Sequence, residues 1–175
     1  MLVSNGVTNI SISLDGFADV HDIVRKRSGL FGDIVSRIQI LNTLRHKKAG
    51  KPLLTIKTVL LDPMVDRLEE FYAFCNEVLH ADCLNVSIMK TARHAQFDFR
   101  IYETLNDIEK AGEPMCYEYA RTQDIPEKLA ELIRCSKKGR CSVTLYPGMP
   151  RQEEIVSIFK NGGKECFGPC YLPWS

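Results

Sequence analysis

The chain has 175 residues, of which 45% are hydrophobic and 26% are charged. This composition is ordinary for a globular protein, and the length suffices for one domain with its own core. Because 23 basic residues nearly balance 22 acidic ones, the charge does not favour binding to nucleic acid or to an anionic membrane. No apolar run approaches the roughly 18 residues that cross a bilayer, and no signal peptide is recognisable, so we expect a cytoplasmic protein.

The first element that the pattern predicts is a strand from Asn9 to Ser13, in which polar and apolar residues alternate. Asp15 and Gly16 form a turn dipeptide directly after it. In parallel α/β sheets, ligands bind at the carboxyl ends of the strands. We therefore expect a binding site near Ser13 and Asp15.

The rest of the chain alternates helical and strand patterns. A loop with at most one helical turn is expected from Phe17 to Lys26. The further expected elements are helices at about 31–47, 64–80, 124–136 and 152–160, and strands at 53–61, 83–89 and 141–146. Residues 91–123 show no steady period and are expected to form an insertion over the open end of the sheet. The basic run that begins at Arg45 is interpreted as charges that complement a helix end.

Connections of this length join parallel strands, so the fold class is α/β, as either a doubly wound sheet or an arc of a barrel. The first strand has no upstream neighbour in this sequence, and its exposed edge predicts self-association. A free-standing α/β binding or interaction module is one function that fits this description.

The seven cysteines are an odd number, which argues against a disulfide framework. Cys75 and Cys83 lie in helix and strand patterns, where cysteine usually acts as a small hydrophobe. A zinc site is a further possibility, and its ligands would be Cys135, Cys141, Cys166 and Cys170.

The segment from Ser13 to Arg25 has the spacing SLDGxxxxHDxxR. It resembles the fourth strand and the following loop of radical S-adenosylmethionine enzymes, in the branch that continues into a SPASM-type cluster domain. The resemblance implies that residues 1–160 are the carboxyl-terminal part of a partial (β/α) barrel. Near the end, CYLPW resembles the C-x-x-P-W that opens a SPASM region, so residues 161–175 would begin that extension, with Cys170 and Cys166 as cluster ligands.

In such enzymes a four-iron four-sulfur cluster cleaves S-adenosylmethionine to a 5′-deoxyadenosyl radical, which abstracts hydrogen from a peptide or small-molecule substrate. The CxxxCxxC motif that holds the cluster belongs upstream of the first strand and is missing from this sequence. We therefore expect this chain to be inactive on its own.

The resemblance also suggests roles for individual residues. Ser13 would contact S-adenosylmethionine, and Arg25 would offer a planar guanidinium to its carboxylate. Asp15 could accept hydrogen bonds from the ribose hydroxyls, although an aspartate before glycine often serves only the turn. The alternative for Arg25 is a surface ion pair with Asp19 or Asp22.

Two further positions are less defined. His21 could act as a general base, but with Asp22 it is more simply explained as fixing the loop. Thr58 and Lys57 must point to opposite faces of their strand. We favour Thr58 for the cofactor site, because a lysine inside a packed barrel needs a partner.

Overall fold

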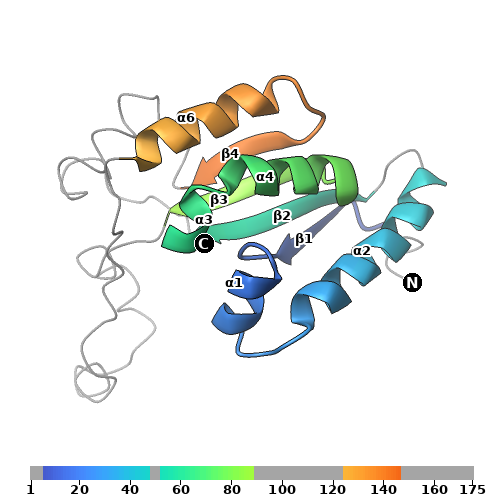
Figure 1. Cartoon of the computed structure of the whole chain (residues 1–175). Helices are drawn as coiled ribbons and strands as arrows, with labels where there is room; N and C mark the ends of the chain where they lie inside the picture. Colours follow the sequence, from blue (N-terminus) through green and yellow to red (C-terminus); the bar gives the residue numbers. More distant parts are fainter. Residues whose placement is uncertain (1–5, 48–51, 89–123, 147–175) are drawn as a thin grey trace, which may run out of the picture.

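The structure is a computed structural model and describes residues 6–47, 52–88 and 124–146 (Figure 1). Its centre is a sheet of four parallel strands in the order β1-β2-β3-β4. The strands are β1 (Asn9–Ser13), β2 (Leu53–Leu60), β3 (Cys83–Ile88) and β4 (Ser142–Tyr146). The prediction of a parallel α/β fold is confirmed, and each strand lies within a residue of its predicted bounds.

The helices are α1 (Ala18–Val24), α2 (Leu30–His46), α3 (Asp62–Val65), α4 (Leu68–Ala73), the π-helical turn η2 (Phe74–Val78) and α6 (Ile125–Ser136). The long helix predicted for 64–80 is therefore divided into three pieces. It breaks at Arg67, whose φ of −105° and ψ of 9° are not helical. The loop predicted after β1 contains a helix, α1, because its amides bond back to Phe17 O.

One face of the sheet carries the core. On β2, Leu54, Ile56 and Leu60 are almost completely buried, whereas Leu53 and Lys57, which alternate with them, are exposed. The same alternation holds on β3 and β4. Helices α2, α4 and α6 cover the buried face (Figure 1). No described element covers the other face, which we call the open face.

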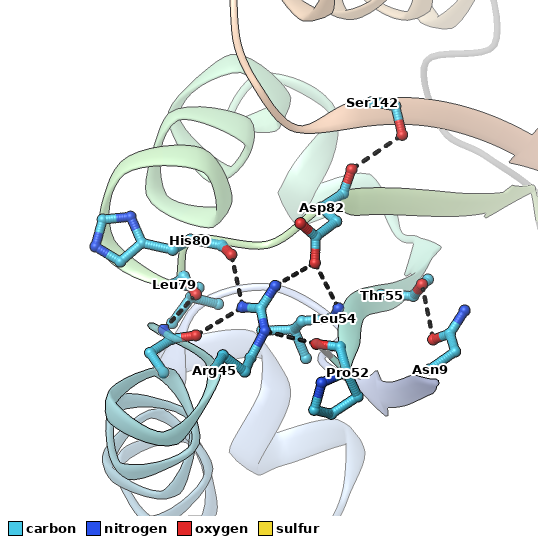
Figure 2. A network of polar contacts seen from close by, with 10 residues as sticks. Asn9, Arg45, Pro52, Leu54, Thr55, Leu79, His80, Asp82 and Ser142 are labelled. Atoms are coloured by element: carbon cyan, nitrogen blue, oxygen red, sulfur yellow. Dashed lines mark hydrogen bonds and ion pairs between the residues drawn. The ribbon is translucent and has the colours of Figure 1, made fainter. Parts of the chain in front are cut away.

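The amino ends of the strands are tied together by Arg45 of α2, which is 5% exposed (Figure 2). Its guanidinium donates to Pro52 O at 2.7 Å, to His80 O at 3.0 Å and to the Asp82 carboxylate. Asp82 also accepts from the Leu54 amide at 2.6 Å. Arg45 does lie in the last turn of α2, as expected, but it is also a buried structural residue, which the sequence pattern did not indicate.

Several sequence-based predictions lie outside the described residues. They are the insertion at 91–123, the helix at 152–160, the cluster ligands Cys166 and Cys170, and the extension at 161–175. These remain predictions.

Candidate functional site

The open face of the sheet carries mostly polar side chains in three rows that follow the strand register, although Val59 and, before the first row, Leu53 are apolar. The rows are Ser11, Thr55, Cys83 and Ser142; then Ser13, Lys57, Asn85 and Thr144; then Val59, Ser87 and Tyr146. Parallel strands covered on both faces are usually apolar throughout. A polar face on a parallel sheet therefore indicates a surface that contacts solvent or a ligand.

The middle row contains the chemically most varied groups. Asn85 Nδ2 donates to Thr144 Oγ1 at 2.8 Å, which leaves the amide oxygen of Asn85 available. Lys57 is the one charged side chain in the three rows, and it makes no hydrogen bond or ion pair with another described residue. The row offers a hydroxyl, an ammonium and an amide side by side on adjacent strands.

Thr58 does not line this face. It is 4% exposed and shares the helix-covered face with Ile56 and Leu60. Because side chains alternate along a strand, Lys57 lies on the opposite, open face, where an ammonium group needs no protein partner. The assignment of Thr58 to a cofactor site remains a prediction.

Ser13 ends β1 at the carboxyl edge of the sheet. It is exposed, and its hydroxyl has no hydrogen-bond partner among the described residues. The next residue, Leu14, donates its amide to Lys57 O at 2.8 Å and lies fully buried in the core. Backbone hydrogen bonds between β1 and β2 therefore continue past Ser13 and fix its backbone, while its side chain lies on the open face.

Asp15 and Arg25 form an ion pair at the same edge. Arg25 donates to one carboxylate oxygen of Asp15 through Nε at 2.8 Å and Nη2 at 2.7 Å. The other oxygen of Asp15 lies 3.4 Å from the Val59 amide. Asp15 is thus buried and paired within the protein, and it orients Arg25, while its role in binding ribose remains a prediction.

The Arg25 side chain remains 43% exposed, and its Nη1 has no partner among the described residues. The alternative ion pairs considered for Arg25 are not formed. Asp19 pairs with Arg67 at 2.7 Å, and Asp22 accepts from the amides of Gly29 and Phe31 at 2.6 and 2.8 Å, which caps α2.

His21 lies beneath this ion pair and is 1% exposed. Its Nδ1 accepts the Asp15 amide at 3.0 Å, so the ring proton resides on Nε2. Nε2 has no partner among the described residues. Burial lowers the pKa of His21, although the Asp15 carboxylate opposes that shift. A neutral His21 fixes the Asp15 turn, as expected, and leaves one buried donor unused.

Gly16 is required at the turn that brings these residues together. Its φ is +127°, and a Cβ atom there would lie 2.5 Å from Met64 Sδ. Any other residue would be strained and would collide with α3. The turn dipeptide recognised in the sequence thus sets the direction in which the chain leaves β1 toward α1.

The described residues contain no group of three His, Cys, Asp or Glu side chains that could hold a metal ion. Burial raises the pKa of Cys75 well above its usual value and that of Cys141 to about 12. Cys75 behaves as the buried hydrophobe expected, whereas Cys83 is half-buried on the open face. The zinc site proposed from the sequence includes Cys166 and Cys170, which lie outside the described residues, and it remains a prediction.

Comparison with protein-family models, curated proteins and solved structures finds no match for this chain. Within the described ranges, no helix is both long enough and apolar enough to cross a membrane. Function must therefore be inferred from the residues and geometry above.

Proposed function

We propose that this chain is the carboxyl-terminal part of a radical S-adenosylmethionine partial barrel, in which Ser13 and Arg25 bind the cofactor. The observation that supports this most is their placement at one edge of the sheet. Ser13 presents a free hydroxyl at the end of β1. Asp15, two residues after Ser13, forms the ion pair that holds the Arg25 side chain at the same edge.

The order of the strands favours an arc of a barrel over a doubly wound sheet. Right-handed crossovers place every helix on the same face when consecutive strands are neighbours. A doubly wound sheet reverses its strand order and has helices on both faces. Here the order β1-β2-β3-β4 does not reverse, and one face is open and polar. In a barrel, that face would line the interior.

The fit of the cofactor can be judged from the hydrogen-bond donors that have no partner among the described residues. Nη1 of Arg25 can donate to the methionyl carboxylate, and the Ser13 hydroxyl can donate to the carboxylate or to a ribose oxygen. Nε2 of His21 is a third donor, buried and unsatisfied. When bound, S-adenosylmethionine supplies the adenosyl group with which radical enzymes abstract hydrogen. In this proposal Ser13 and Arg25 bind and orient it, and Asp15 orients Arg25.

An iron-sulfur cluster does not fit the described residues, because they offer no set of three ligands. No catalytic step through a cluster is therefore assigned to them. Cys166 and Cys170 remain predicted ligands of an auxiliary cluster.

The open face suggests the class of substrate. Lys57, Asn85 and Thr144 form a polar row with one positive charge, which suits a peptide or a small molecule bearing carbonyl or carboxylate groups. Such a substrate would lie beside the cofactor, because Ser13 belongs to the same row.

Isothermal titration with S-adenosylmethionine tests the cofactor site. S-adenosylhomocysteine serves as a second ligand, since it keeps the carboxylate and ribose but lacks the sulfonium. Arg25→Lys and Ser13→Ala should each weaken binding by about 10-fold or more, because each removes a hydrogen bond to a charged or polar group.

The matched controls are Arg27→Lys, an exposed arginine paired with Asp33, and Ser11→Ala, one row earlier on the same strand and face. Neither should change the affinity. If the folded chain binds neither ligand, or if Arg25→Lys and Arg27→Lys behave alike, the proposal fails and a cofactor-free α/β module becomes the better interpretation.

A further inference from the structure

β1 is an edge strand, and half of its backbone groups face away from the sheet. Leu53 donates to Thr8 O and Leu14 donates to Lys57 O, at 2.9 and 2.8 Å. In a parallel ladder, these bonds mean that the backbone N–H and C=O groups of the even-numbered residues of β1 point toward β2. The amides and carbonyls of Asn9, Ser11 and Ser13 therefore point outward, where no described strand pairs with them.

The sequence of this edge is nearly the same in both directions. Asn9-Ile10-Ser11-Ile12-Ser13 has Ser11 at its centre, with isoleucine on each side and a small polar residue at each end. It contains no proline and no charged residue, either of which would discourage pairing between edges. Two copies could approach each other without repulsion between like charges.

An antiparallel pair with its two-fold axis at Ser11 satisfies both features. Ser11 then lies opposite Ser11 of the second copy, and Asn9 lies opposite Ser13. These are the residues whose backbone groups point outward, so they become the hydrogen-bonded pairs. Ile10 lies opposite Ile12 in the closer, non-hydrogen-bonded pairs, where their side chains pack.

The helix-covered side of this edge is incompletely buried. Ile10 and Ile12 are only half-buried, whereas Leu54 and Ile56 beside them on β2 are fully buried. On α2, Ile40 is 64% and Leu44 is 45% exposed.

These two α2 residues lie toward the open edge. Asn42, between them, donates to Leu79 O just before β3, so its side of α2 faces the interior of the sheet. Residues two positions before and after Asn42 lie on the opposite side of the helix. Ile40 and Leu44 are therefore turned away from β3.

The topology also suits contact between two copies of α2. Because α2 connects the neighbouring strands β1 and β2, a two-fold axis at the outer edge of β1 brings the two copies of α2 to the same face on either side of the axis. A stable dimer buries about 800 Å² on each partner, more than a five-residue strand provides, so Ile40 and Leu44 supply the remainder.

We infer that two copies of this chain associate through β1 in an antiparallel, two-fold symmetric pair, with α2 packing on α2 across the axis. The inference does not depend on the cofactor site, since it uses the backbone of Ser13 and not its hydroxyl. A further strand contributed by a longer chain is the competing occupant of the same edge.

Sedimentation equilibrium of the 175-residue chain tests the pairing, and a dimer is expected at micromolar concentration. Ser11→Lys places two ammonium groups opposite each other and should raise the dissociation constant by about 100-fold or more. The control is Ser142→Lys, in the same row on the other edge strand, β4, and it should leave the dimer intact. Thermal melting verifies that both variants are folded.

A second measurement is independent of the lysine variants. Opposed residues in a hydrogen-bonded antiparallel pair have Cα atoms about 5.5 Å apart, within reach of a disulfide. The Ser11→Cys variant should therefore form, on mild oxidation, a covalent dimer in which mass spectrometry finds position 11 of one copy linked to position 11 of the other. The wild-type chain cannot form this link, whatever its seven native cysteines do. A folded wild-type monomer, or a dimer that neither Ser11 substitution affects, would overturn the inference.

Discussion

The two ends of the sheet use polar side chains in opposite ways. At the amino end, Arg45 bonds to Asn42 and Asp82, and the three side chains bond to backbone groups of two segments, residues 52–54 and 79–80 (Figure 2). At the carboxyl end, the Ser13 hydroxyl, the Lys57 ammonium and Nε2 of His21 have no partners among the described residues. At the amino end the polar side chains are hydrogen-bonded within the protein, whereas at the carboxyl end several donors have no partner among the described residues.

This contrast separates stability from binding. A buried charge with all its hydrogen bonds made resists removal, because its partners would be left unsatisfied. A free donor at the carboxyl edge can be removed at little structural cost and is available to a ligand. The comparison predicts large stability effects at the amino end and small ones at the carboxyl end.

The largest effect is expected for Arg45→Met. The substitution leaves the Asp82 carboxylate and the carbonyls of Pro52 and His80 without their donor, and should lower the free energy of unfolding by about 3–5 kcal/mol. Urea denaturation followed by circular dichroism measures the change. Arg37→Met, an exposed arginine on the same helix, is the control and should change stability by less than about 0.5 kcal/mol. If the two substitutions changed the free energy of unfolding equally, the polar network at the amino end would not have the stabilising role assigned to it.

The sequence predicts the parts of this contrast that depend on local pattern. Alternation predicted β1 and β3, and the dipeptide Asp15-Gly16 predicted the turn and hence the edge where Ser13 lies. A nearly continuous apolar run predicted β2 but also suggested burial on both faces, whereas the strand is buried on one face only. The tertiary role of Arg45 was hidden because its partners His80 and Asp82 are 35 and 37 residues away. The helix dipole alone can explain a basic residue in the last turn of a helix. The sequence pattern therefore gives no reason to look for distant hydrogen-bond partners.

The orientation of β2 shows a second limit. Alternation requires Lys57 and Thr58 to face opposite sides, but it does not tell which side the helices cover. That choice depends on the handedness of the crossovers and on the packing of α2 and α4. The pairing of Asp15 with Arg25 was likewise hidden, because Asp19 and Asp22 are nearer in sequence and equally charged.

An intermediate effect is expected from the titration of His21. Burial lowers its pKa in the folded state below the usual value near 6.5, so the unfolded chain binds the proton more readily. Stability should be constant above about pH 6.5 and should fall as the pH decreases below it, toward the folded-state pKa. Protonation would also end the acceptance of the Asp15 amide by Nδ1.

Urea unfolding between pH 7 and pH 5 measures this dependence. A His21→Leu variant should lose most of the slope in that range, whereas His46→Gln, which replaces an exposed histidine of α2, should keep it. A slope that survives the replacement of His21 would show that another group is responsible.

The smallest effect is expected for Lys57→Met. The side chain is exposed on the open face and has no described partner, so its loss should change the free energy of unfolding by less than about 0.5 kcal/mol. Thr58→Lys is the matched comparison one residue along, where an ammonium group would be buried against Ile56 and Leu60 and should destabilise the fold severely. Urea denaturation of the two variants therefore compares the two faces of one strand. A large loss for Lys57→Met would mean that Lys57 has a structural partner, and the carboxyl end would then resemble the amino end more than the free donors suggest.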